Sequence, residues 1–302
     1  MLETYKKVIS ELSLKDGAFR AILDCFARKV FILPSFNDGE NVFKCVGDCI
    51  FEIILDDAKV WKKCIDAIVN LVKEGAFEVD KDGIRLMAMD PSQISMLSFT
   101  MQKSAFSKYE VSEKAKIGLN MENFGKVMGR MRVKEKMVLK YDGKGKLDVT
   151  FIADKNTREF KLPLIDVAPG PSKALQIDYT ATVKLKGSVM KEILKDAALV
   201  SPHVLLVADQ GRFKVEATGD SADVDLEFQG GEVDVQLKKT TSAVFSREYL
   251  DDITRGCDED GDVTLHLGAP TQTDPRPKPL KVEYKLGDGA FTFFLAPRIE
   301  TD

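Results

Sequence analysis

The order of predicted elements in this sequence repeats once. Each half reads strand, long helix, hairpin, strand, short helix and further strands. Equivalent positions in the two halves lie about 128 residues apart, as expected of a repeated supersecondary unit. They occur in the long helices, in the hairpin turns and at the ends of the strands that follow: Val60 and Val189, Gly83 and Gly211, and Phe99 and Phe228. Helices set between antiparallel strands, all on one side, predict an α+β fold.

The strands are predicted from short apolar runs that turn residues separate. Residues 51–55 (FEIIL) open the first half, and residues 179–185 (YTATVKL) open the second. Three Asp-Gly pairs stand at turns between such runs: Asp82-Gly83, Asp142-Gly143 and Asp288-Gly289. Asp-Gly is a strong hairpin signal, because glycine readily adopts the positive φ that a tight turn needs.

The first long helix is predicted from Lys59 to Lys73, because apolar residues recur there every three or four positions. Asp56 or Asp57 is expected to cap its start, since a short carboxylate accepts hydrogen bonds from free N–H groups, and Gly75 is expected to end it. The face opposite the apolar residues carries Lys59, Lys62, Lys63 and Lys73. One such face alone is typical of an ordinary solvated surface.

Basic residues recur on the other predicted helices, Met121–Met131, Ser188–Leu199 and Arg247–Arg255. They stand opposite the apolar faces or at the helix ends: Lys126, Arg130, Arg132, Lys191, Lys195 and Arg255. Acidic neighbours dilute the pattern in the second half: Glu192, Asp251 and Asp252. Because the bases recur at equivalent positions, we interpret them as one basic surface within an acidic chain, whose formal net charge is −4.

We divide the chain into four segments: 1–49, 50–165, 166–178 and 179–302. Residues 168–173 (APGPSK) contain two prolines and a glycine and therefore indicate a connector between the two similar domains. The first segment lacks the alternating strands of the rest. We expect one or two amphipathic helices over Leu2–Phe31, broken at Asp16-Gly17, and a loop over Pro34–Gly39.

No membrane span, secretion signal or disulfide framework is expected. No apolar run approaches the roughly 20 residues that a spanning helix needs. Five scattered cysteines fit a reducing cytosol better than paired disulfides, so we expect a cytoplasmic protein. Cys45 and Cys49 lack the second Cys/His pair that would complete a zinc site, so we expect no metal.

No catalytic or cofactor site is expected either. Residues 258–262 (DEDGD) resemble part of a calcium loop, but no glutamate follows at the required distance, which favours an acidic turn. His203 and His266 have no paired nucleophile. A metal-dependent nucleic-acid-processing enzyme that uses the acidic clusters is the alternative from a different class.

Several motifs resemble the DNA sliding clamps of the proliferating cell nuclear antigen (PCNA) type, and the archaeal members most closely. They occur in one order over about residues 50 to 300: Met87–Leu97 (MAMDPSQISML), Thr157–Val167 (TREFKLPLIDV), Leu194–Ser201 (LKDAALVS) and Leu280–Glu300, which contains FFLAPRIE. The resemblance implies a duplicated two-domain clamp subunit that assembles into a closed homotrimeric ring, with helices lining the hole and antiparallel sheets outside. It also implies that edge strands near Thr157–Leu162 and Asp223–Phe228 of adjacent subunits pair, which would cover exposed sheet edges.

By resemblance, such a ring is a processivity factor that encircles double-stranded DNA in replication and repair, without reading its sequence. The residues that match DNA-facing positions of the family are Lys62, Lys63, Lys126, Lys195 and Arg255. Helical facing alone adds Lys59, Lys73, Arg130, Arg132 and Lys191. Lysines suit sliding, because they neutralise phosphates without specific base contacts. The resemblance also implies a clamp-loader ATPase as the loading partner. It further implies that the protein associates with the nucleoid of an organism without a nucleus.

The family also binds short peptides of DNA polymerases, ligases and flap nucleases in an apolar pocket beneath the connector. The matching residues are Met89, Gln93, Ile94, Met96, Pro279, Leu280, Phe294, Ala296, Pro297 and Ile299. Such a pocket suits a peptide with aromatic anchors. Two departures bear on partner choice: Gln93 replaces a common histidine, and the connector lacks the usual apolar pair, for which Leu175 and Ile177 are candidate substitutes.

Residues before position 50 match nothing in the family, whose members usually begin Met-Phe-Glu where this chain has Ile50-Phe51-Glu52. We expect translation to start at Ile50 through a non-standard start codon, with a genuine appended helix as the alternative. The alternative to a homotrimer is a subunit of a heterotrimeric repair or checkpoint clamp.

Overall fold

The computed structural model describes residues 31–37, 40–46, 49–168, 170–171, 175–272 and 275–298. The chain forms two compact units, Met1–Ile50 and Phe51–Asp302, which we describe separately. Within the described residues, no helix combines the length and apolar character that crossing a membrane requires.

The first unit contains an antiparallel hairpin. Strands β1 (Phe31–Asn37) and β2 (Glu40–Val46) pair with Asn37 opposite Glu40. The predicted loop over Pro34–Gly39 is therefore wrong up to Asn37. Asp38 and Gly39, the rest of that predicted loop, lie outside the described residues. The helices predicted before residue 31 lie outside the described residues.

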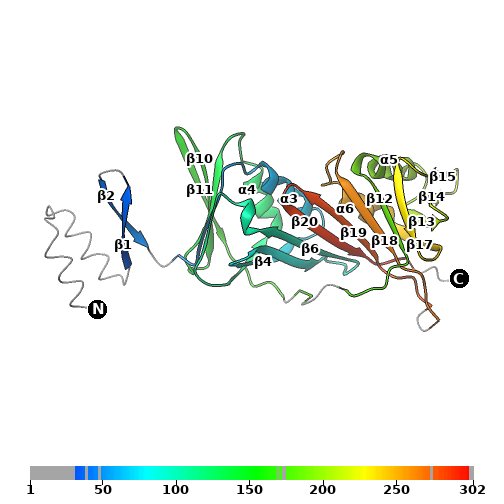
Figure 1. Cartoon of the computed structure of the whole chain (residues 1–302), viewed down its shortest axis with the longest axis horizontal. Helices are drawn as coiled ribbons and strands as arrows, with labels where there is room; N and C mark the ends of the chain where they lie inside the picture. The colour runs from blue at the N-terminus through cyan, green and yellow to red at the C-terminus, as the bar shows by residue number, and fades with distance from the viewer. Residues whose placement is uncertain are drawn as a thin grey trace. The chain divides into compact units, whose positions relative to one another are not determined.

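The second unit contains two copies of one order of elements, shown in Figure 1. The first copy consists of β3 (Phe51–Leu55), α3 (Lys59–Val69), β4 (Glu74–Asp80), β5 (Gly83–Met89), β6 (Ser95–Gln102), the short 3-10 helix η1 (Lys103–Ala105), β7 (Lys108–Val111), β8 (Ala115–Asn120), α4 (Met121–Met128), β9 (Lys136–Tyr141), β10 (Lys146–Ala153) and β11 (Asn156–Pro163). The second consists of β12 (Ala181–Lys186), α5 (Gly187–Ala198), β13 (His203–Asp209), β14 (Arg212–Thr218), β15 (Asp223–Phe228), β16 (Val233–Leu237), β17 (Thr241–Ser246), α6 (Arg247–Thr254), β18 (Asp262–Leu267), β19 (Leu280–Leu286) and β20 (Gly289–Leu295).

The duplication extends to the strand registers. Ile53 lies opposite Leu139, and Ala181 lies opposite Leu267; 181 minus 53 and 267 minus 139 both give 128. Arg85 opposite Thr100 and Phe213 opposite Phe228 are related by the same shift. Phe228 thus corresponds to Thr100 rather than to Phe99. A shift of one residue exchanges the two faces of a strand, which agrees with Phe99 being buried and Phe228 half-buried.

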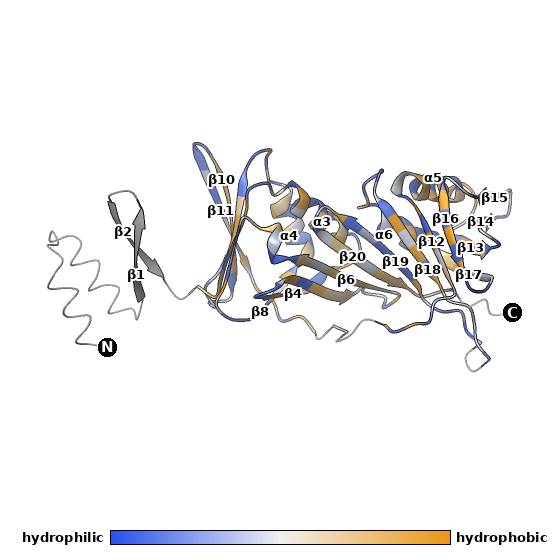
Figure 2. Ribbon diagram, in the orientation of Figure 1, coloured by the Kyte–Doolittle hydropathy of each residue, from blue (hydrophilic) through white to orange (hydrophobic). Residues whose placement is uncertain are grey.

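The described residues of the second unit form three antiparallel sheets. One has the order β11-β10-β9-β3-β7 and another the order β15-β14-β13-β17. The third runs β16-β12-β18-β19-β20-β6-β5-β4-β8 and joins the two copies, because β20 pairs with β6. In Figure 2, hydrophobic residues concentrate in the strands and helices, whereas many connecting loops are hydrophilic.

The helices pack against one face of the sheets. Trp61 on α3 is buried, and its ring lies 6.2 Å from the ring of Phe99 on β6. Asp57 accepts a hydrogen bond from the Lys59 N–H at 2.9 Å, but the N-cap residue is Ala58, so the prediction that Asp56 or Asp57 caps the helix is wrong by one position. The helix nevertheless ends at Val69, and Gly75 lies inside β4, so the predicted end near Lys73 is wrong. Leu71 and Val72 are buried although they follow the helix, so the apolar pattern in the sequence extends beyond its end.

Candidate nucleic-acid interface and partner pocket

Among the described residues of the second unit, four α-helices form one row in the order α4, α3, α6, α5 (Figure 1). Gly125 on α4 lies so close to Val69 on α3 that a Cβ there would be 3.1 Å from a Val69 methyl. At the other side of α3 lies the segment that follows α6: a Cβ on Gly256 of that segment would lie 2.6 Å from the Cβ of Ala67 on α3. Because α5 packs on α6, helices of both copies are continuous neighbours.

The bases that match family positions all lie on this row, and each is paired with a carboxylate. Four of them are exposed, and Lys62 is half-buried. The nitrogen–oxygen distances are 2.5 Å for Lys62–Asp66, Lys63–Asp258 and Lys126–Glu122, 2.6 Å for Lys195–Glu192, and 2.8 Å for Arg255 to both Asp251 and Asp252. The row therefore carries alternating charge rather than a uniformly positive surface.

Three members of these pairs have shifted pKa values that favour their charged forms. The hydrogen bond from Lys126 lowers the pKa of Glu122. The hydrogen bonds to Glu192 and Asp251 raise the pKa values of Lys195 and Arg255, respectively. A phosphate that approaches one of the paired bases has to compete with the carboxylate beside it.

The bases predicted from helical facing alone behave differently from one another. Lys59, Lys73, Arg130 and Arg132 are exposed. Lys191 is half-buried, and its ammonium donates to the Cys257 carbonyl oxygen at 2.7 Å. Lys191 thus contributes less to the exposed surface than its helical position suggests.

The predicted partner pocket lies on the opposite face of the nine-stranded sheet. Met89 on β5 is opposite Met96 on β6, which in turn is opposite Phe294 on β20. The intervening residues Leu97 and Phe99 point to the helices and are buried. Strand pairing therefore brings residues from both copies into one apolar row.

Exposure divides the predicted pocket residues into a floor and a rim. Met96, Leu280 and Phe294 are buried. Met89 and Ile94 are 38% and 39% exposed, which is more than core packing would leave. At the rim, Pro279 and Pro297 are half-buried and Ala296 is exposed. Ile299 lies outside the described residues.

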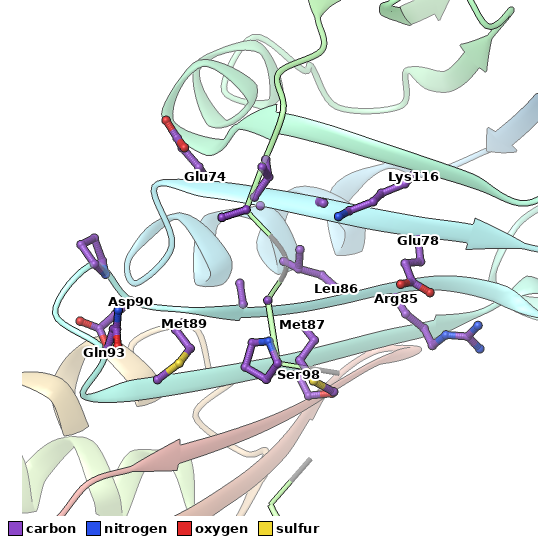
Figure 3. Close-up of a pocket in the computed structure, with 18 of the residues that line it drawn as sticks. Glu74, Glu78, Arg85, Leu86, Met87, Met89, Asp90, Gln93, Ser98 and Lys116 are labelled. Carbon is purple, nitrogen blue, oxygen red and sulfur yellow. The ribbon is translucent and has the colours of Figure 1, made fainter. Parts of the chain in front are cut away.

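A cavity of about 900 Å³ adjoins this row. Of the predicted residues, Met89 and Gln93 line it. Figure 3 shows that it continues along β5 past Met87 to a polar end with Glu78, Arg85 and Lys116. The connector forms part of its wall through Val167, Ala168, Gly170 and Pro171. We did not predict Met87 and Arg85, although they alternate with buried residues along β5 and so share the face of Met89.

The loop Asp90–Ser95 forms the end of the cavity nearest to Met89. Gln93 has a φ of 59°, a left-handed conformation that is uncommon for a residue with a side chain. The Ile94 carbonyl oxygen accepts from the Ala296 N–H at 2.9 Å, so the loop is attached to the chain after β20. Among the residues the structure describes, no three His, Cys, Asp or Glu side chains gather in a group able to hold a metal ion.

Comparison with known proteins identifies the family. Residues 50–169 match the model of the PCNA N-terminal domain, and residues 173–299 match that of the C-terminal domain. The chain belongs to the proliferating cell nuclear antigen family. It is a sliding clamp with the duplicated α+β fold, as the sequence motifs predicted. The family consists of non-catalytic processivity factors.

Named relatives and solved structures agree with this clamp assignment. The DNA polymerase sliding clamp of Thermococcus fumicolans is 35% identical over 254 residues, which cover 83% of this chain and 99% of the relative. That of Pyrococcus furiosus is 34% identical over the same shares. PCNA from Thermococcus kodakaraensis superposes with a TM-score of 0.76 at 26% identity and covers 82% of this chain and 100% of its own. A. fulgidus PCNA bound to the C-terminal region of FEN-1 superposes with a TM-score of 0.75 at 23% identity and covers 83% of this chain and 100% of its own, which supports the fold alone.

Proposed function

We propose that this clamp acts as a homotrimeric ring that encircles duplex DNA and tethers DNA polymerase, ligase and flap nuclease during replication and repair. The observation that carries the proposal is the continuous row of helices with a base on every member. Retention comes from topology, because a closed ring cannot leave a duplex sideways. Loading then requires a ring-opening partner, which we propose to be a clamp-loader ATPase.

The proposed ring closes through two sheet edges. Strand β11 ends one sheet and β15 ends another, so both leave one side unpaired within the chain. Head-to-tail pairing of β11 with β15 of the next copy would satisfy both edges, and three copies would close the ring. The β15 edge carries Asp223, Asp225 and Glu227, and β11 carries Glu159 beside Lys161, at a nitrogen–oxygen distance of 3.6 Å. The pairing proposal therefore rests on the two unpaired edges and not on a charge difference between them.

The helix row is proposed to face the DNA phosphates. Mixed charge suits a sliding contact, since weak and exchangeable ion pairs hold the duplex without fixing its position. We assign the main contacts to Lys62, Lys63, Lys126, Lys195 and Arg255. Lys59, Lys73, Arg130, Arg132 and Lys191 form the secondary set.

The apolar row with its cavity is proposed to bind partner peptides. The relative from A. fulgidus binds the C-terminal region of FEN-1, and a peptide of this kind is our candidate ligand. Half-exposed Met89 and Ile94 would be covered by it. Leu175 is 47% exposed on the connector and is a candidate for the missing apolar contact.

The remaining assignments are also proposals. We retain domain boundaries at residues 50–165 and 179–302 with a connector at 166–178. We further propose that the chain itself has no enzymatic activity and works in the cytoplasm at the nucleoid. Metal-dependent nuclease activity that disappears in Asp258→Asn and Asp260→Asn would instead support the enzymatic alternative.

The DNA-facing assignment is tested with Lys62→Ala, Lys63→Ala and Lys195→Ala combined. Retention of the loaded ring on closed circular DNA should fall, while native mass remains that of the wild type. The matched control replaces three exposed strand lysines outside the helix row and the cavity, Lys140, Lys146 and Lys184, and so changes the net charge equally. Unchanged loading and sliding of the helix variant would refute the assignment.

A further inference from the structure

The loop Asp90–Ser95 is organised around one buried carboxylate. Asp90 is 5% exposed. Its Oδ1 accepts from the N–H groups of Ile94 at 2.7 Å and Ser95 at 2.5 Å, and its Oδ2 accepts from the Ser92 N–H at 2.8 Å. The Asp90 main chain makes two more hydrogen bonds. Its N–H donates to the Ser95 carbonyl oxygen at 2.9 Å, and its carbonyl oxygen accepts from the Gln93 N–H at 3.0 Å.

The fourth hydrogen bond to this carboxylate comes from the other copy of the repeat. The Tyr249 hydroxyl on α6 donates to the Asp90 Oδ2 at 2.9 Å, although 159 positions separate the two residues. Burial, together with the bond to Asp90, raises the pKa of Tyr249, so its hydroxyl remains a protonated donor around neutral pH. A helix of the DNA-facing row is thereby attached to the loop that bounds the partner pocket.

We propose that Asp90 and Tyr249 form a positioning pair that holds the Asp90–Ser95 wall of the partner pocket in its binding conformation. The inference rests on the proposed peptide-binding function of that pocket. Asp90 lines the cavity itself, whereas Tyr249 acts through Asp90 and the loop residues Gln93 and Ile94.

The physical argument concerns the cost of the loop conformation. A left-handed Gln93 is unfavourable in isolation, so its neighbours have to fix it. The buried carboxylate does this by accepting several N–H groups at once, and such charged acceptors make strong hydrogen bonds. Loss of the Tyr249 hydroxyl leaves Oδ2 with one fewer donor in a buried site, which loosens the loop. A peptide then has to order the loop as it binds, and its affinity falls.

The test compares Tyr249→Phe with the wild-type clamp in titrations with a peptide that has the FEN-1 C-terminal sequence. We expect binding to weaken about threefold to tenfold, the loss typical of one hydrogen bond. Amide hydrogen exchange should accelerate at Ile94 and Ser95, with native mass and DNA loading unchanged. Because a purely structural role would destabilise the clamp as a whole, local exchange distinguishes the two roles.

Tyr284→Phe is the matched control. The Tyr284 hydroxyl donates to the Ile253 carbonyl of the same helix at 2.8 Å, so this variant also loses a bond to α6 but leaves Asp90 intact. Exchange at Ile94 and Ser95 should remain at the wild-type rate in it. Combining Tyr249→Phe with Asp90→Asn should weaken binding by less than the sum of the single effects.

The outcomes separate this inference from the proposed pocket. Wild-type affinity in Tyr249→Phe, or weaker binding without faster exchange in the loop, would overturn the positioning role and leave the pocket standing. Failure of the wild-type clamp to bind the peptide would overturn both.

Discussion

At the scale of single residues, buried carboxylates fix the loops beside both candidate surfaces. Asp90 serves the partner pocket, and Glu135 serves the segment after α4. Glu135 is 3% exposed, accepts from the Arg132 N–H at 2.8 Å and pairs with Arg158 of β11 at 2.5 Å. Arg158 also donates to the Arg130 carbonyl at 3.0 Å. The Glu135–Arg158 salt bridge thus holds the main chain of Arg130 and Arg132, whose own side chains are exposed.

Glu135→Gln tests this support. The change removes the charge that compensates a largely buried Arg158, and we expect the clamp to lose about 2 to 4 kcal/mol of unfolding free energy. Urea unfolding followed by circular dichroism measures it. Glu122→Gln breaks an exposed pair instead and should leave the midpoint almost unchanged. Equal midpoints for both variants would contradict the structural role of Glu135.

At the scale of elements, local patterns predicted the helices, and long-range packing decided what the patterns missed. Pairs four residues apart, such as Lys62–Asp66, follow from helical spacing alone. Lys63–Asp258 does not, because 195 positions separate its members and only the packing of α3 against the segment after α6 brings them together. Asp90 and Tyr249 were missed for the same reason. The partner pocket rested on family resemblance, since a cross-strand row such as Met89, Met96 and Phe294 requires the sheet order.

The carboxylates on the helix row give a second prediction. Glu122→Gln combined with Glu192→Gln frees Lys126 and Lys195 for phosphate. We expect tighter association with a linear duplex, and a salt dependence of log K that is steeper by up to about 0.9 per additional contact. Fluorescence anisotropy between roughly 50 and 200 mM salt measures the slope.

A control with the same net charge isolates the local effect. Glu113→Gln combined with Glu232→Gln changes two exposed carboxylates away from the helices. This variant should keep the wild-type slope. If both double variants steepen the slope equally, overall charge and not the pairing on the helix row governs DNA association.

At the scale of the whole molecule, duplication explains how one chain supplies both halves of an interface. In the two copies, β11 is equivalent to β20, and β6 is equivalent to β15. Because β20 pairs with β6 inside the chain, β11 of the first copy and β15 of the second copy are left at sheet edges. Pairing between these two unlike edges joins chains head to tail, and such contacts either close into a ring or continue into a filament. Subunit stoichiometry is therefore the property that sequence repetition alone leaves open.

Leu226→Glu tests ring closure through β15. Leu226 is half-buried on β15, so a carboxylate there would lose its hydration when the incoming edge strand docks, which should block pairing without disturbing the core. Native mass spectrometry should give three times 33.6 kDa for the wild type and a single chain for the variant, whereas Asp225→Asn should keep the trimer. A wild-type chain that stays monomeric would favour the heterotrimeric alternative, because a free β15 edge would then await a different subunit. A trimer that survives Leu226→Glu would contradict ring closure through β11 and β15 and would place the subunit interface elsewhere.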